Sequence, residues 1–456
     1  MAFHRTALLT AGFIVFAGAP ASAQLHATGV PELSSRPGAA YTIYIDPAGF
    51  NYNGTWIGST PGNNLGLNGR GPGEAFTAGD VTEIKAIWAA LSNQYRGVDV
   101  NITTVDPAIA AGMAGNDVQR QNFYDSQPRM MHTIIGPPGN DGWQGGADGL
   151  AGLGVIDSAQ TIGSGLHTNW MFSQDVSFGS DVANGNYIGN IASHEGGHTF
   201  GLQHQGDFTG ATHVNEYGLG DSFSGAGSYV GTMGNAYDRQ RVTWRVGDAV
   251  DDFGNQFIQN DVAVIMGNSG MSFVDDGIGH TMGTATALAI DGAGNIDVTD
   301  STHAGWINPL DAGNPQPIGS EHYTTDFFSF YSDGSTEISL VLNDGNDLLV
   351  AGIADNGATF RGMLTILDDA GNIIGTGTED SSTMFTSFED TLAAGQYFAQ
   401  ISSFGGHVQD AAAFNAAYYF DMGGYFLTGD GFVIPAPGTA VLISLMGVVA
   451  TRRRRA

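Results

Sequence analysis

The stretch that decides the fold and chemistry of this chain is His194-Glu195-Gly196-Gly197-His198-Thr199-Phe200-Gly201-Leu202-Gln203-His204. On a helix, His194 and His198 lie at i and i+4, so both imidazoles project from one face. Gly201 allows the chain to leave the helix at positive φ, and the turn can bring His204 back as a third ligand. Three protein ligands leave the fourth position of a zinc ion open, as in catalytic sites. Glu195 is the expected catalytic residue, because it lies beside a ligand without binding the metal.

Two other interpretations of the three histidines are open at this point. The imidazoles could satisfy hydrogen bonds in a core, or they could hold zinc in a protein that has lost its activity. Gly196 and Gly197 each cost a helix about 1 kcal/mol relative to alanine. Apolar residues of the same segment indicate that packing supplies the missing stability: Ile188, Ile191, Ala192 and Phe200.

The histidine motif resembles the signature of the metzincin clan of zinc metalloproteases, in which a methionine-containing turn follows. Gly231-Thr232-Met233-Gly234 matches that turn, and Tyr237 follows the methionine by four residues, a pattern similar to a group of exported bacterial members. The resemblance implies a zinc-dependent endopeptidase that acts on protein or peptide substrates. It also implies that Met233 lies beneath the zinc ligands as a structural residue, and it makes Tyr237 a candidate transition-state stabiliser. A plain core methionine is the alternative for Met233.

The N-terminal segment, 1–23, has the pattern of a secretory signal peptide. A short basic start is followed by an apolar run and then by Ala21-Ser22-Ala23 before Gln24. A retained membrane anchor is the alternative, although the apolar run is short for a span of about 20 residues. Residues 24–40 are expected to form a linker.

The C-terminal segment, 431–456, combines Pro435-Ala436-Pro437-Gly438, an apolar run and the cluster Arg452 to Arg455. This order resembles the PEP-CTERM sorting signal of bacteria. The resemblance implies a sorting protease of the exosortase type as a partner, and a location at the cell envelope, the outer surface or outside the cell. A simple membrane tail is the alternative, and in both cases the arginines stay on the cytoplasmic side.

The composition agrees with export. The chain has no cysteine, so disulfides cannot form, and its 15 basic residues face 45 acidic ones. Five of those arginines lie in the two terminal segments, which leaves 10 basic residues and a net charge of −35 in the mature chain. Such a charge excludes nucleic acid and anionic membranes as favoured partners. The many Asp-Gly and Asp-Asn turns make Ca²⁺ a candidate structural ion, but solvated loop carboxylates are the preferred interpretation of any single aspartate.

The expected fold class is α+β, with a metzincin-like mixed-sheet zinc protease domain over 41–266, a linker over 267–283 and an all-β sandwich over 284–430. Alternating strands and one-sided helices support the first domain. Its expected strands are Tyr41 to Ile45, Val98 to Ile102, Met131 to Ile135 and Gly152 to Ile156, and its expected helices are Ala78 to Arg96 and Asn260 to Met266. We expect the segment Gly149 to Ser158 to be the sheet edge that binds substrate backbone.

Short alternating segments between turn sequences predict the sandwich. Asp326 to Phe330 and Leu392 to Tyr397 resemble the pre-peptidase C-terminal domain of secreted bacterial peptidases, which implies binding of a cell-surface polymer or a spacer role. The clearest expected strands are Phe327 to Tyr331, Glu337 to Leu342, Gly362 to Leu367, Ile373 to Gly375 and Gln396 to Ile401.

Three functional hypotheses follow. The first is peptide-bond hydrolysis with His194, His198 and His204 on zinc and Glu195 as general base. The second is a non-catalytic envelope or adhesion protein with a degenerate peptidase domain. The third is a zinc hydrolase that acts on a non-protein polymer, which a substrate screen separates from the first.

Overall fold

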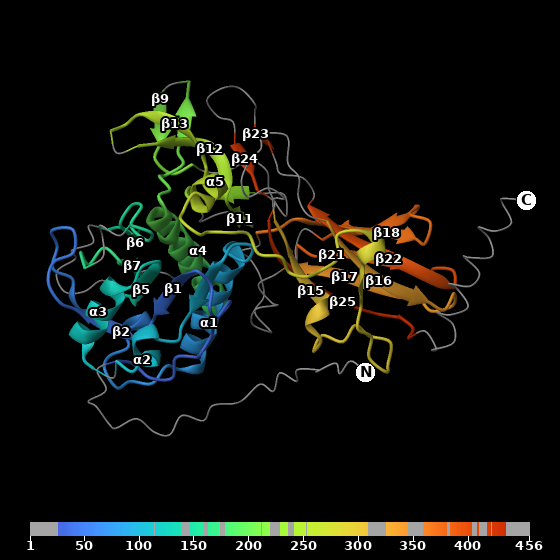
Figure 1. The fold of residues 1–456 in the computed structure, drawn as a ribbon, viewed down its shortest axis with the longest axis horizontal. Helices are drawn as coiled ribbons and strands as arrows, with labels where there is room; N and C mark the ends of the chain where they lie inside the picture. The colour runs from blue at the N-terminus through green and yellow to red at the C-terminus, as the bar shows by residue number, and fades with distance from the viewer. Residues whose placement is uncertain are drawn as a thin grey trace, which may run out of the picture.

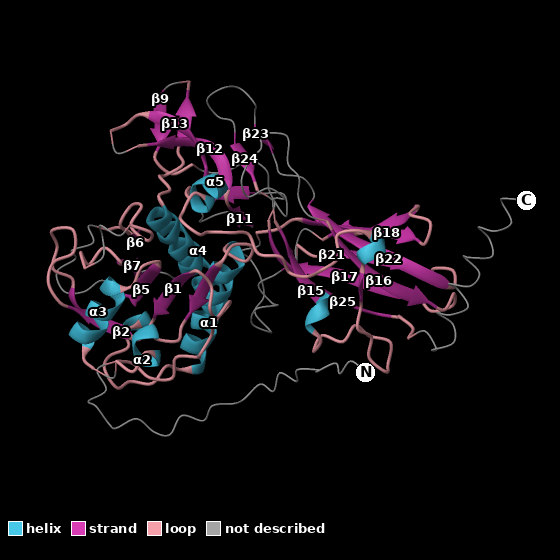
Figure 2. Ribbon diagram, in the orientation of Figure 1, coloured by secondary structure: helices cyan, strands magenta, loops and turns pink. Residues whose placement is uncertain are grey.

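The computed structural model describes residues 26–113, 115–137, 146–158, 163–173, 178–210, 212–218, 229–235, 241–251, 253–308, 325–344, 359–380, 384–403, 408–409, 417–420 and 422–434 (Figure 1). The predicted signal peptide, the sorting segment from Pro435 onward and Tyr237 lie outside these residues. In the described part of the chain, no helix combines the length and the apolar character needed to cross a membrane. The chain is a mixed α and β protein in which sheets predominate (Figure 2).

A five-stranded sheet of order β4-β1-β5-β7-β6 forms the centre of the N-terminal part. Its first four strands are parallel, and the short edge strand β6 runs antiparallel to β7. The strands β1, β4 and β5 confirm three expected strands, whereas β7 was not predicted. The bounds are β1 (Tyr41–Asp46), β4 (Val100–Thr103), β5 (Met130–Gly136), β6 (Gly149–Leu150) and β7 (Thr168–Phe172).

The expected strand Gly152 to Ile156 is wrong, and the expected edge Gly149 to Ser158 is a strand only at β6. Beyond β6 the chain turns, with Gly154 at a φ of 63°. The backbone N–H groups of Gly154 and Ile156 donate to the carbonyls of His198 and Thr199, at 2.8 and 3.1 Å. These N–H groups therefore donate to carbonyls in the last turn of α4 instead of pairing with a neighbouring strand.

The described residues include five α-helices, and α4 carries the first two histidines of the motif (Figure 1). The expected helices of the first domain are confirmed as α1 and α5. Each long helix begins at a hydroxyl cap, Thr77 for α1 and Ser180 for α4, and α4 ends at Gly201 with a φ of 105°. The bounds are α1 (Ala78–Gln94), α2 (Pro107–Ala110), α3 (Asp117–Ser126), α4 (Asp181–Phe200) and α5 (Asp261–Met266).

Helices α1 and α4 pack side by side at unusually close range, because glycines of α4 face α1. A Cβ built on Gly185 would lie 2.5 Å from the Cβ of Ala86, and one built on Gly189 would lie 2.8 Å from the Cβ of Ala90. Farther along, the Tyr95 hydroxyl donates to the Ser193 carbonyl at 3.2 Å. The residue order of these contacts shows that the two helices run parallel. Glycine at i and i+4 of α4 therefore sets the distance between the helices.

The remaining described strands of this part form smaller sheets. A four-stranded sheet of order β13-β12-β24-β23 combines strands from distant parts of the sequence, since β12 pairs with β24. The remaining elements are hairpins and one short parallel pair. The bounds are β2 (Gly49–Tyr52), β3 (Gly62–Leu65), β8 (Asp207–Thr209), β9 (Thr212–Asn215), β10 (Tyr229–Gly231), β11 (Arg241–Thr243), β12 (Arg245–Val250), β13 (Gln256–Asn260), β23 (Val408–Gln409) and β24 (Ala417–Tyr419).

The C-terminal part has two five-stranded sheets, of order β14-β16-β22-β18-β19 and β15-β25-β17-β21-β20. Alternate residues from both sheets, such as Phe328, Ile366, Leu340 and Leu427, meet in one buried apolar cluster. All five expected strands are confirmed, whereas β14, β15, β20, β21 and β25 were not predicted. The bounds are β14 (Thr286–Ala287), β15 (Ala304–Ile307), β16 (Asp326–Ser332), β17 (Ile338–Asp344), β18 (Gly362–Asp368), β19 (Ile373–Thr376), β20 (Thr378–Glu379), β21 (Thr386–Asp390), β22 (Gly395–Ser403) and β25 (Gly423–Asp430).

The two parts of the molecule are in direct contact. The Gly424 N–H, in β25, donates to Asn93 Oδ1 of α1 at 2.9 Å. The guanidinium groups of Arg36 and Arg96 lie over the ring of Trp306 in β15, at 5.3 and 4.9 Å from the ring centre. These contacts join the sandwich to the end of α1, on the side away from the central sheet (Figure 1).

Three surface turns share the pattern Asp-x-x-Gly-Asn, at 251–255, 291–295 and 368–372. In each turn the aspartate accepts hydrogen bonds from backbone N–H groups and from the asparagine side chain. The asparagine hydrogen bonds lower the pKa of Asp251, Asp291 and Asp368. These carboxylates therefore remain anionic and close turns.

The packing of α1 on α4 gives the first prediction. Gly189→Ala should destabilise the protein by about 1–3 kcal/mol through overpacking, although alanine by itself favours a helix by about 1 kcal/mol. Chemical denaturation measures the change. Gly292→Ala is the control, because a Cβ built there has no neighbour within 4 Å. If the Gly189→Ala protein is as stable as the wild type, α1 can move away from α4 without a loss in the free energy of unfolding.

Candidate metal centre

The structure brings the three predicted ligands together at one end of α4. The ligand nitrogens of His194, His198 and His204 all lie within 4.8 Å of one another. The closest pair is Nε2 of His198 and Nε2 of His204, 3.0 Å apart. In the part of the chain that the structure describes, these residues are the one such group of three potential metal ligands.

Hydrogen bonds at Nδ1 fix the orientation of each imidazole. The Nδ1 atoms of His194 and His198 donate to the carbonyls of Thr232 and Leu202, at 2.8 and 2.6 Å. His204 Nδ1 donates to Glu216 Oε1 at 2.9 Å. Since these oxygens accept the Nδ1 protons, each Nε2 keeps a lone pair. Lone pairs that converge in this way repel one another unless they share a cation, so the donor set fits a zinc ion.

The electrostatic surroundings keep the buried imidazoles neutral. Burial lowers the pKa of His194 well below its ordinary value, and the neighbouring imidazoles of His198 and His204 lower it further. Burial and His204 lower the pKa of His198 to about 4. Neutral imidazole is the form that binds a metal.

A chain of buried polar groups connects α1 to the first ligand. Gln94 donates through Nε2 to Asn190 Oδ1 at 2.7 Å and accepts from Thr232 Oγ1 at 3.0 Å. The carbonyl of Thr232 in turn accepts from His194. Gln94 therefore holds Thr232, whose carbonyl orients the imidazole of His194. The sequence pattern did not predict this role of Gln94.

Met233 is fully buried directly against the histidine helix. A Cβ built on Gly197, between His194 and His198 on α4, would lie 2.5 Å from Met233 Sδ. On the other side of the helix, a Cβ built on Gly196 would lie 2.8 Å from the Tyr95 hydroxyl. The two glycines of the motif thus leave room for Met233 and Tyr95.

Glu195 is buried between α4 and the sheet edge. Its carboxylate packs against the backbone of Gly149 in β6, where a Cβ would lie 2.5 Å from Oε1. Burial raises the pKa of Glu195 to about 8, with a contribution from the Asp148 carboxylate. A nearby dication would favour the ionised form and oppose this shift. Glu195 lines a cavity of about 220 Å³ together with Asp148, Ile191 and His194.

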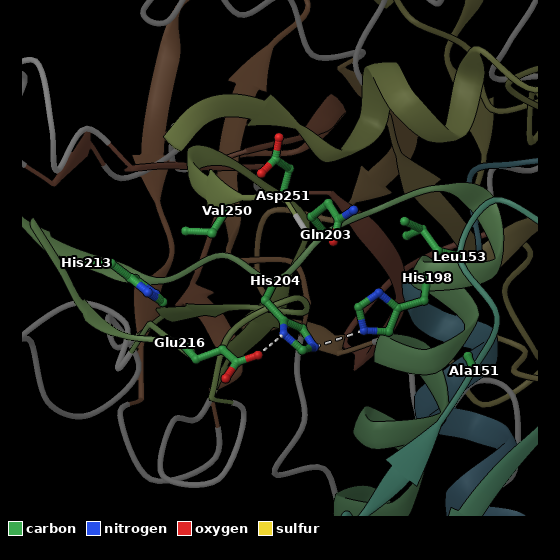
Figure 3. A pocket seen from close by; sticks show the side chains of 9 residues that line it. All are labelled: Ala151, Leu153, His198, Gln203, His204, His213, Glu216, Val250 and Asp251. Carbon is green, nitrogen blue, oxygen red and sulfur yellow. Dashed lines mark hydrogen bonds and ion pairs between the residues drawn. The ribbon is translucent and has the colours of Figure 1, made fainter. Parts of the chain in front are cut away.

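A second cavity, of about 390 Å³, lies against His198 and His204 (Figure 3). Figure 3 shows the two imidazoles facing each other, with Glu216 on the far side of His204. The lining residues are Ala151, Leu153, His198, Gln203, His204, His213, Glu216, Val250 and Asp251. The three histidines thus line two cavities, His194 the smaller one and His198 and His204 the larger one.

The structure also places Tyr217 at the centre, whereas the predicted Tyr237 lies outside the described residues. The Tyr217 ring centre lies 4.5 Å from that of His204 and 5.9 Å from that of His194. Burial raises the Tyr217 pKa to about 12, and the Glu216 and Glu195 carboxylates add to this effect, so the hydroxyl stays protonated. No spacing rule links Glu216 and Tyr217 to the histidine motif, so the sequence pattern predicted neither residue.

Backbone hydrogen bonds hold the Tyr217 segment over the centre. The Gly218 N–H donates to the Gln205 carbonyl at 2.7 Å, and the Gly218 carbonyl accepts from Asn235 N–H at 2.9 Å. The Gln205 N–H donates to the Met233 carbonyl at 2.9 Å. The third ligand, the Tyr217 segment and the methionine turn are therefore one hydrogen-bonded unit.

The polar chain through Gln94 gives the second prediction. Gln94→Leu should weaken zinc binding roughly 10- to 100-fold, because Thr232 and the first imidazole lose their support. Competition with a chromogenic chelator measures the affinity. Gln121→Leu is the matched control, since Gln121 is also buried and makes two hydrogen bonds, to Asn53. Equal losses in both variants would contradict a specific role for Gln94.

Comparisons with known proteins leave the family of the chain unassigned. No protein-family model matches the chain, and no curated protein matches it. One similar solved structure is the pre-peptidase C-terminal domain of collagenase from Bacillus anthracis, with 11% identity and a TM-score of 0.16. That match covers 31% of this chain and 92% of the collagenase domain.

Proposed function

We propose that this protein is an exported or cell-surface zinc-dependent endopeptidase with a metzincin-like catalytic part. The observation that carries the proposal is the convergence of three Nε2 lone pairs, all oriented through Nδ1, beside the buried carboxylate of Glu195. A purely structural zinc site would have four protein ligands and no need of such a carboxylate. His194, His198 and His204 would hold the ion, which supplies Lewis-acid chemistry and lowers the pKa of bound water.

The protein groups account for substrate binding and proton transfer. In the described residues β6 is the edge strand of the central sheet, and its backbone groups are offered to an extended peptide, as in β-augmentation. Glu195 accepts the proton of the attacking water and then delivers it to the leaving amine, a role that its contact with Gly149 of β6 makes geometrically direct. The Tyr217 hydroxyl donates to the carbonyl oxygen of the scissile bond as negative charge develops there.

Glu195→Gln tests the proposal directly. The variant keeps the shape of the side chain but cannot accept a proton, so peptide hydrolysis should fall at least ~100-fold while zinc content is unchanged. Cleavage of a mixed peptide library and elemental analysis are the two measurements. His198→Ala is the companion variant, which should lose both zinc and activity.

Two results would contradict the proposal. A Glu195→Gln protein that cleaves as fast as the wild type would exclude Glu195 as the base. A zinc-loaded wild type that cleaves no peptide of the library would favour the non-catalytic envelope protein, and cleavage of a polysaccharide instead would favour the non-protein hydrolase.

Tyr217→Phe tests the third group of the site. Because the hydroxyl acts only as charge develops, its removal should lower kcat roughly 100-fold with little change in KM or zinc content. Steady-state kinetics on one cleaved peptide gives both constants. Tyr397→Phe, in the sandwich, is a control that should leave both unchanged. An unaltered kcat in Tyr217→Phe would remove this residue from the mechanism.

A further inference from the structure

The two cavities beside the metal centre are joined by one stretch of chain at the sheet edge. Residues 146–149, ending in β6, line the smaller cavity, whereas Ala151 and Leu153 line the larger one. The segment therefore passes from one cavity to the other across the metal centre. A peptide bound along this edge would place the side chains on the two sides of its scissile bond in different cavities.

The position of Glu195 decides which cavity belongs to which side of that bond. This inference rests on the proposed function, in which Glu195 delivers a proton to the leaving amine. Glu195 lines the smaller cavity with Gly149 and does not line the larger one. The amine side of the substrate therefore lies toward the smaller cavity, and the residue before the cleaved bond lies in the larger cavity.

The larger cavity combines apolar walls with two carboxylates. Leu153 and Val250 provide the apolar walls, while Glu216 and Asp251 provide negative charge (Figure 3). The described residues that line this cavity include no lysine or arginine. An aliphatic stem with a cationic end suits this combination, since lysine and arginine bury their stems and keep the charged end near acceptors.

Both carboxylates are held in place by other groups. The side chain of Glu216 is 61% exposed, and its Oε1 accepts a hydrogen bond from His204 Nδ1. Asp251 is fixed by its own turn, and hydrogen bonds from Asn255 lower its pKa. The negative charges are thus positioned before a substrate arrives, which reduces the ordering cost of binding a cation.

We propose that the cavity lined by Glu216 and Asp251 selects substrates with arginine or lysine immediately before the cleaved bond. The volume of about 390 Å³ leaves room for either long side chain. Because the carboxylates are partly exposed, the preference should weaken as ionic strength rises.

A peptide series tests this specificity. The peptides are identical except for arginine, lysine, norleucine or glutamate before the cleaved bond, and kcat/KM is measured for each. Arginine or lysine should exceed norleucine roughly 10- to 100-fold, and glutamate should be the poorest. The ratio between peptides cancels any general loss of activity, which matters because Glu216 also contacts a predicted ligand.

Two variants and one matched control connect the preference to the carboxylates. Glu216→Gln keeps an oxygen that can accept from His204 Nδ1. Asp251→Asn keeps Oδ1, which accepts from the two backbone N–H groups of its turn, and loses only the hydrogen bond from Asn255 Nδ2. Together they should reduce the arginine-to-norleucine ratio to within about threefold of unity. Asp291→Asn changes the same kind of turn in the sandwich and should leave the ratio unaltered.

The outcomes separate this inference from the proposed function. Cleavage of all four peptides at similar rates, or an unchanged ratio in the double variant, would overturn the specificity while the peptidase stands. A basic preference only after the cleaved bond would overturn the assignment of the cavities. Failure of the zinc-loaded wild type to cleave any peptide would overturn the peptidase and this inference together.

Discussion

The close contact between α1 and α4 is the constraint on which the rest of the structure depends. Gly185 and Gly189 bring the backbone of α4 against Ala86 and Ala90 of α1. Any other residue at these two positions would place a β-carbon too close to α1. Glycine weakens an isolated helix, but tertiary packing provides most of the stability of helices in proteins. The histidines are carried by this helix, and their position is therefore set by contacts that lie about one and a half to two and a half turns before the motif.

Polar groups then extend this arrangement from the helix to the loops. Gln94, at the end of α1, reaches Thr232 in the methionine turn, and the turn orients His194. Gly197 allows Met233 of the same turn to lie against α4. The three histidines thus occupy fixed positions because a helix, a buried amide and a turn from distant parts of the sequence constrain one another.

The acidic residues of the chain have two different roles in the structure. Many aspartates close turns such as 251–255, 291–295 and 368–372, where their hydrogen bonds are local. Glu216 belongs to a different group, because it accepts a hydrogen bond from His204 and lines the larger cavity. A single carboxylate can serve both purposes, as Asp251 closes its turn and lines that cavity.

The sequence by itself determined the elements and residues that depend on short-range spacing. The pattern from His194 to His204 predicted a helix with two ligands on one face, a turn at Gly201 and a returning third ligand, because helix periodicity and glycine φ preferences are local properties. Only the tertiary structure decided that residues 152–156 form turns, since their N–H groups bond to the end of α4. It alone placed Gln94 and Tyr217 at the centre, because contacts between residues far apart in sequence follow from packing and leave no periodic trace in the chain.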